Sequence, residues 1–160
     1  MRSVGRLLAA AVIAGGALAG GASADDAEEV LGRHMVGEAL LAAHLVASAE
    51  KAGMTPDQIK AVLKEVAERS AIDEFWITDE QGRAYLTNQD FEFTFSADPA
   101  QEPQAAAFWP LIAGTEKVVI QDAQARDYDG RVFKYVGVAG VDQPRIVQVG
   151  VSAENLPRED

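Results

Sequence analysis

Two extended runs near the end of the chain constrain its fold most strongly. They are Val132–Ala139 and Arg145–Val151, and β-branched and aromatic residues dominate both. The connection between them, Gly-Val-Asp-Gln-Pro at positions 140–144, has the composition of a turn. Strand-forming runs on either side of such a turn predict an antiparallel hairpin.

The side chains of the first run alternate between two faces of the predicted sheet. One face carries two aromatic side chains and then two very small residues: Phe133, Tyr135, Gly137 and Ala139. The other face carries Val132, Lys134, Val136 and Val138. Neither face is polar throughout, so we expect other elements to cover the sheet on both sides. The first face predicts a cavity, and Gly137→Leu is expected to fill that cavity while leaving the fold intact.

The first 24 residues have the three-part pattern of a secretory signal peptide. Arg2 and Arg6 supply a positive start, Leu7–Ala19 is apolar, and Ala22–Ala24 is a small-residue cleavage site. The apolar run is short and contains two glycines, which disfavours a membrane span, although an uncleaved N-terminal anchor remains the alternative. Cleavage after Ala24 predicts a periplasmic or secreted protein with no membrane span after the signal.

Residues 25–160 are expected to form one domain, because this length suits a single hydrophobic core. Loss of Arg2 and Arg6 lowers the number of Lys and Arg from 14 to 12 against 25 Asp and Glu, so the net charge falls from −11 to −13. Such a charge repels phosphate backbones and anionic lipids, so neither nucleic acid nor a membrane surface is expected as a partner. The chain has no cysteine, so its stability must come from packing.

Two helices are predicted before the first strand. Asp25–Lys51 is rich in helix-forming residues and begins with acids that suit a helix N-terminus. The segment Thr55–Gln58 is a capping box with proline at the first helical position, and it predicts a second helix to about Arg69. Two stripes of the first helix predict a broad face that docks on the sheet: Val30, His34, Gly37, Leu41, His44 and Ser48, and Leu31, Met35, Glu38, Ala42, Leu45 and Ala49.

The middle of the chain predicts a second hairpin and a short helix. Phe75–Thr78 and Arg83–Thr87 flank an Asp-Glu-Gln-Gly turn. Residues 89–102 are compatible with a short edge strand or with a loop that folds its phenylalanines over the sheet. Pro103–Ala113 predicts a helix interrupted by its internal proline, and Lys117–Gln121 predicts a further strand.

Helices followed by antiparallel strands indicate an α+β domain with a single sheet. Three parts of the chain make a more specific likeness: FWITDEQGRAYLTN at 75–88, AAAFWPLI at 105–112, and DGRVFKYVGVAG at 129–140 with RIVQVGVSAENL at 145–156. Their order resembles that of a Cache domain, the extracytoplasmic relative of the PAS fold in bacterial chemoreceptors and sensor kinases. The resemblance implies an antiparallel sheet of about five strands with the long N-terminal helix packed on one face.

The resemblance also implies a sensor that binds a small organic molecule in a pocket on the sheet. Amino-acid-binding members carry an arginine two residues before the tryptophan of the pocket helix, and here that position is Ala107. We therefore expect a neutral, aromatic or weakly polar ligand. No transmembrane, kinase or methyl-accepting segment follows Leu156, so a separate membrane-bound partner is expected to receive the signal.

Aromatic residues from separate segments are expected to converge on this pocket: Trp76, Tyr85, Phe108, Trp109, Phe133 and Tyr135. For any one of them, a place in the ordinary core remains the alternative. Arg126 and Asp127 precede the closing hairpin, where related domains place polar ligand contacts, although a solvated turn explains each as well. Together with Gly137, these residues form the predicted ligand site.

No sequence pattern for a cofactor, a metal or a catalytic nucleophile stands out. His34 and His44 are ten residues apart, ~15 Å along a helix, and cannot share one metal ion. We therefore predict a protein that is not an enzyme and has no cofactor. Two alternatives stay open. One is a small cone-shaped α+β enzyme with a buried carboxylate of raised pKa beside a tyrosine. The other is a structural or inhibitory module with an exposed apolar patch and no cavity.

Overall fold

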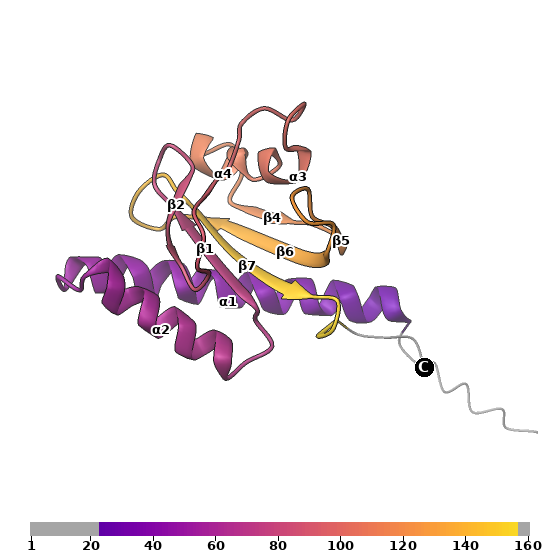
Figure 1. Ribbon diagram of the computed structural model, residues 1–160, viewed down its shortest axis with the longest axis horizontal. Helices are drawn as coiled ribbons and strands as arrows, with labels where there is room; N and C mark the ends of the chain where they lie inside the picture. Colours follow the sequence, from indigo (N-terminus) through magenta and orange to yellow (C-terminus); the bar gives the residue numbers. More distant parts are fainter. Residues whose placement is uncertain (1–22, 157–160) are drawn as a thin grey trace, which may run out of the picture.

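The computed structural model describes residues 23–156, so the predicted signal peptide lies almost wholly outside the described residues. Two helices come first, and strands with two short helices among them follow (Figure 1). In chain order the elements are α1 (Ala24–Lys51), α2 (Pro56–Glu68), β1 (Glu74–Thr78), β2 (Arg83–Thr87), β3 (Phe93–Thr94), α3 (Pro103–Ala106), α4 (Trp109–Ala113), β4 (Val118–Ile120), β5 (Gln124–Ala125), β6 (Val132–Ala139) and β7 (Ile146–Ser152).

The strands form one antiparallel sheet in the order β3-β2-β1-β7-β6-β4, with β5 also paired to β6. The predicted α+β class is therefore confirmed. The sheet has seven strands where about five were expected, because the two-residue strands β3 and β5 extend it. The predicted closing hairpin is present, and β6 and β7 pair from Phe133↔Ser152 to Ala139↔Ile146.

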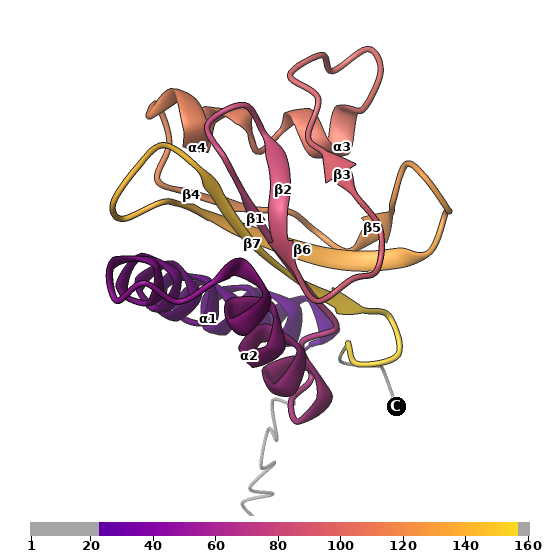
Figure 2. The ribbon, with the colours of Figure 1, turned by 60° about the vertical axis from the view of Figure 1, so that its left-hand side comes forward.

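Helical layers cover both faces of this sheet, as Figure 2 shows. Helix α1 packs on β6 and β7, and α2 packs on β2 and β1. Helix α4 lies on the opposite face, over the same central strands. The alternation expected along β6 is confirmed, because Val136 and Val138 belong to the core under α1, whereas Phe133 and Tyr135 belong to a second core on the opposite face.

Only part of one of the two stripes predicted to dock α1 on the sheet does so, because Met35, Ala42 and Ala49 are buried while Leu45 is exposed. The buried residues follow a four-three spacing: Met35, Ala39, Ala42, Val46 and Ala49. The other predicted stripe, from Val30 to Ser48, is exposed throughout, and Leu41 is 73% exposed. The prediction of a broad docking face was wrong because a single helix on a sheet buries a face of only about 100°. The alanines on the buried stripe let the helix backbone come close to the strands.

The N-terminus of α1 is capped by Ser23, whose hydroxyl accepts from the Asp26 N–H while the Asp26 carboxylate accepts from the Ser23 N–H. Cleavage after Ala24, as predicted, would remove this cap. Among the described residues, one helix, Asp25–Lys51, is long and apolar enough to cross a membrane by length and composition, and a third of its most apolar window is buried in the fold.

Buried cations fasten α1 to the sheet near both of its ends. Near the start, Lys134 Nζ lies 3.0 Å from the Glu28 carboxylate and donates to the Gln121 carbonyl. Near the end, the Arg145 guanidinium donates to the Glu50 carboxylate over 2.8 Å and also to the Asp142 carboxylate. Both cationic side chains are almost fully buried. The position of α1 on the sheet is therefore fixed by charge as well as by apolar packing.

The outcomes of three further local predictions differ. The Thr55 and Gln58 capping box begins α2, which ends at Glu68, one residue before the expected end. The segment 89–102 contains the short strand β3 within a loop. The helix expected over Pro103–Ala113 is two helices, because Pro110 lies in the first turn of α4 and starts it instead of interrupting a longer helix.

The ion pair at the start of α1 predicts a pH dependence of stability. The Ala123 N–H hydrogen bond and the Lys134 ammonium hold the pKa of Glu28 below its usual value. Because the folded pKa is lowered, the stabilisation is complete above about pH 4.5, the pKa of an unperturbed Glu, and is lost as pH falls toward the folded pKa. Glu28→Gln should therefore lower the free energy of unfolding at pH 7, and the difference from the wild type should shrink below about pH 4.5.

Urea unfolding at a series of pH values between 7 and 3 measures this difference. Glu29→Gln is the matched control, because Glu29 is its exposed neighbour. A difference for Glu28→Gln that is the same at every pH would contradict the assignment.

Candidate ligand-binding site

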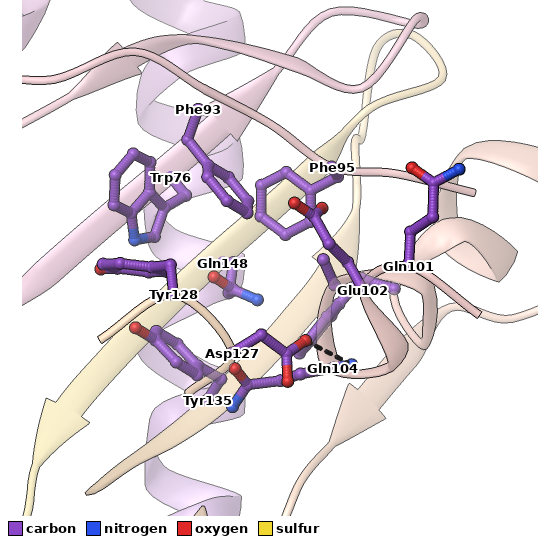
Figure 3. Close-up of a pocket in the computed structure, with 12 residues that line it drawn as sticks. Trp76, Phe93, Phe95, Gln101, Glu102, Gln104, Asp127, Tyr128, Tyr135 and Gln148 are labelled. Carbon is purple, nitrogen blue, oxygen red and sulfur yellow. Dashed lines mark hydrogen bonds between the residues drawn. The ribbon is translucent and has the colours of Figure 1, made fainter. Parts of the chain in front are cut away.

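A cavity of about 190 Å³ lies on the face of the sheet opposite α1. The sheet forms its floor, and β3, the segment leading into α3, and the β5–β6 loop form its walls (Figure 3). Its lining residues are Trp76, Phe93, Phe95, Gln101, Glu102, Gln104, Ala105, Phe108, Asp127, Tyr128, Tyr135 and Gln148. The volume lies below the 300–1,000 Å³ of sites for drug-sized ligands, so the cavity suits a small metabolite.

Strand register brings the floor residues together. Trp76 on β1 is paired with Gln148 on β7, and Gln148 is in turn paired with Gly137 on β6. Tyr135 is paired with Gly150, where an added Cβ would overlap the tyrosine ring. Because Gly150 on β7 has no side chain, the Tyr135 ring of the neighbouring strand β6 can occupy that space.

A buried ionic network supports one wall of the cavity from behind. Arg126 Nη1 donates to the Glu74 carboxylate over 2.5 Å, and both side chains are 4% exposed. The same guanidinium forms two bonds of 2.7 Å with the Asp129 carboxylate. It also stacks between two rings, 4.5 Å from the centroid of Tyr128 and 4.1 Å from that of Phe133.

The cavity and this network share the Glu74 carboxylate. Its second oxygen accepts from the Trp76 indole N–H over 2.9 Å and from the Tyr135 hydroxyl over 2.7 Å. Two lining residues, Trp76 and Tyr135, are therefore held in place by one buried carboxylate, which Arg126 neutralises. The rings that face the cavity are pre-oriented by charge-assisted hydrogen bonds.

The network shifts the pKa values of Arg126, Asp129, Tyr135 and Tyr128. Burial opposes the charge on Arg126, but its hydrogen bonds with Asp129, Tyr135 and Glu74 outweigh burial, so its pKa lies above the usual value. The bonds from Arg126 hold the pKa of Asp129 below its usual value. Burial and the nearby Glu74 carboxylate raise the pKa of Tyr135, and the same two causes raise the pKa of Tyr128 to about 12.

The Gln148 side chain lies on the cavity floor and is 4% exposed. No side-chain hydrogen bond of Gln148 is found within residues 23–156, its amide atoms keep some accessible surface, and Figure 3 shows the amide pointing into the space between the rings. The Nε2 group of Gln104, another lining residue, is buried and likewise has no partner among residues 23–156. Buried amide groups in proteins are almost always hydrogen-bonded, so the lack of a partner for these two amides within residues 23–156 is unusual.

Four of the nine predicted site residues line the cavity: Trp76, Phe108, Asp127 and Tyr135. Arg126 and Phe133 lie behind its wall, in the ionic network and stacked on Tyr135 respectively. Trp109 lies outside it, where its indole N–H donates to the Phe95 carbonyl and its ring covers Gly82. Ligand binding by these residues stays a prediction.

Tyr85 does not join the other aromatic residues, because it lies on the α1 face of the sheet. Its hydroxyl donates to Glu50 and accepts from Arg145. The pairing of β1 with β2 shifts register, from Ile77↔Leu86 to Thr78↔Ala84, which leaves Tyr85 as the extra residue of a bulge. A bulge re-aims the side chain that strict alternation would place on the other face.

The space expected at Gly137 is already filled. A Cβ at this position would lie 2.7 Å from Phe108 and 3.0 Å from Leu111. Gly137 therefore seats the α3–α4 segment on the sheet and does not line the cavity. The expectation that Gly137→Leu would fill a cavity and leave the fold intact was wrong, because the added side chain would push Phe108 away from β6.

Several site residues escaped the sequence analysis: Glu74, Phe93, Phe95, Gln101, Glu102, Gln104, Tyr128 and Gln148. Two of them carried a usable signal. Gln148 interrupts the apolar run IVQVGV, and Glu74 immediately precedes the apolar β1 residues. A polar residue on a strand covered on both faces must find a partner or face a cavity.

The chain matches no protein-family model, and no curated protein matches it. Its function is therefore argued from the chemistry of the site.

Removal of the Arg126 charge should destabilise the fold strongly. Arg126→Met leaves the buried Glu74 carboxylate without a cation, and breaking a buried pair in this way costs roughly 3–5 kcal/mol. Arg131→Met is the control, since Arg131 also lies over the Phe133 ring but is exposed, and it should cost less than about 1 kcal/mol. Denaturant unfolding measures both, and equal losses would contradict the network.

Replacement of Gln148 tests whether its amide is bonded within the protein. Gln148→Met keeps a similar volume and removes a buried polar group that has no partner, so the free energy of unfolding of the ligand-free protein should stay level or rise. Urea unfolding supplies the measurement. A loss above about 1 kcal/mol would mean that the amide makes a stabilising bond in the folded chain.

Proposed function

We propose that this protein is an extracytoplasmic, Cache-like sensor domain that binds a small organic ligand in the cavity beside Gln148. The observation that carries the proposal is the amide of Gln148, a residue only 4% exposed, which faces a partly open aromatic cavity and has no partner among the described residues. Binding would supply the missing hydrogen bonds and bury the ligand against pre-oriented rings.

The arrangement of the sheet supports a sensing role. Gln148 faces the cavity, while its strand neighbours Val147 and Val149 pack in the core under α1. A ligand that forms hydrogen bonds with Gln148 would therefore act on β7, one of the two strands on which α1 packs. The exposed stripe of α1 provides a surface from which a separate membrane-bound partner would read a shift of the helix.

Two observations favour this role over the alternatives. A carboxylate does lie beside a tyrosine, as a cone-shaped enzyme would require, but Glu74 is paired with Arg126 and receives two further hydrogen bonds. It is therefore poorly placed to exchange protons with a substrate. A purely structural module would have no need of a partly open aromatic cavity lined by two amides without partners among residues 23–156.

Thermal unfolding of the full chain against a metabolite library tests the proposal. A true ligand at about 100 times its Kd should stabilise the protein by about 2.7 kcal/mol. Gln148→Met should abolish that stabilisation, and Gln81→Met, at an exposed glutamine in the β1–β2 turn, should retain it. A library with cationic, neutral and anionic compounds that stabilises nothing would overturn the proposed function.

A further inference from the structure

The charges that face the cavity are of one sign. Two carboxylates line it, those of Glu102 and Asp127, and no lysine or arginine is among its lining residues. The nearest buried cation, Arg126, lies behind the wall and is engaged by two other carboxylates, those of Glu74 and Asp129. The site therefore has no cation left with which to pair an anionic ligand.

Each lining carboxylate is anchored by one oxygen. Glu102 Oε2 accepts from the Ser96 N–H over 3.3 Å, and Asp127 Oδ2 accepts from the Gln104 N–H over 3.1 Å. Within residues 23–156, neither carboxylate pairs with a lysine, arginine or histidine. Both are thus positioned by the backbone while their charge remains uncompensated.

Aromatic rings stand across the cavity from these carboxylates. Figure 3 shows Trp76 and Tyr128 on the side away from Glu102, with Phe93 and Phe95 above Gln148. Ring faces carry partial negative charge and attract cations, tryptophan most strongly. The guanidinium between Tyr128 and Phe133 demonstrates this attraction in the same region, and among the described residues no cationic side chain lies over Trp76 or Tyr135.

We propose that the ligand is a small organic ammonium compound that carries one neutral hydrogen-bonding group. This inference rests on the proposed function and specifies its ligand class. The ammonium group lies between the ring faces and the carboxylates of Glu102 and Asp127, and the neutral group bonds the amide of Gln148. An anion would be repelled by two uncompensated carboxylates, of which Glu102 is half-buried and Asp127 is exposed. This replaces the expectation of a neutral or weakly polar ligand.

Three compounds of nearly the same shape separate the contribution of the ligand's charge to binding from that of its shape. Choline is the cationic probe, 3,3-dimethylbutan-1-ol is its neutral carbon isostere, and 3,3-dimethylbutanoate is a matched anion. Calorimetric titration of the full chain should give choline an affinity at least about tenfold above that of the alcohol, and no binding of the anion. Ethanolamine and tetramethylammonium extend the cationic arm toward smaller head groups.

The outcomes separate the two proposals. Binding of the alcohol or the anion as tightly as choline would overturn the ammonium proposal and leave a ligand-binding function standing. Failure of all three ammonium compounds would also overturn it, even if the metabolite library yields another ligand. Failure of every ammonium compound and of the whole library would overturn the proposed function as well.

Isosteric variants of Glu102 and Asp127 test whether these two carboxylates account for the affinity for choline. Glu102→Gln and Asp127→Asn keep an oxygen that accepts from Ser96 and Gln104, so the fold should hold. Choline affinity should fall about tenfold for Glu102→Gln and by less, about threefold, for Asp127→Asn, because Asp127 is exposed. Glu92→Gln is the control, because it removes an equal charge from an exposed position in the preceding loop. Equal losses in all three variants would assign the effect to the net charge of the protein and contradict this site.

Discussion

The buried charge of Arg126 is the constraint on which the geometry of the site depends. A guanidinium that is 4% exposed has to be neutralised, hydrogen-bonded and shielded, and each requirement places a particular residue. Glu74 and Asp129 supply the charge, and the rings of Tyr128 and Phe133 supply the shielding. Tyr128 stacks on this cation, and Trp76 and Tyr135 donate to its partner Glu74, so one buried cation positions three of the six aromatic residues that line the cavity.

The sheet connects this site with the long helix. Each of the central strands β6 and β7 presents one set of side chains to the cavity region and the alternate set to α1. The ion pairs of Lys134 and Arg145 tie α1 to those strands near both of its ends. A helix held in this way is expected to move with the strands, which would give the proposed ligand on one face a mechanical route to the other face.

The sequence was most informative where a single periodicity decided the outcome. Alternation along β6 separated Tyr135 from Val136, and the capping box at Thr55 located the start of α2. The sequence was least informative where the burial of a residue depended on contacts with a segment far along the chain. Two stripes of α1 had helical spacing, but the stripe that docks combines part of one of them with Ala39 and Val46, which belong to neither.

The remaining errors have the same origin. A bulge without glycine or proline carries no local signal, so Tyr85 was expected on the wrong face. Gly137 was interpreted as empty space, whereas Phe108 fills it from a segment about thirty residues earlier. Gln148 was the opposite case, since a polar residue inside an apolar strand was visible in the sequence. It supports the proposed ligand site because its surroundings hold no partner among the described residues.

The most direct test of the account is an NMR titration that follows the two indole N–H signals and the Gln148 side-chain amide of the labelled protein. The chain has two tryptophans, of which Trp76 lines the cavity and Trp109 does not. With choline, the account predicts that the Trp76 and Gln148 signals shift together and saturate at one concentration, while the Trp109 signal moves far less. A saturating shift at Trp109 with Trp76 and Gln148 unmoved would place the ligand elsewhere and contradict the account.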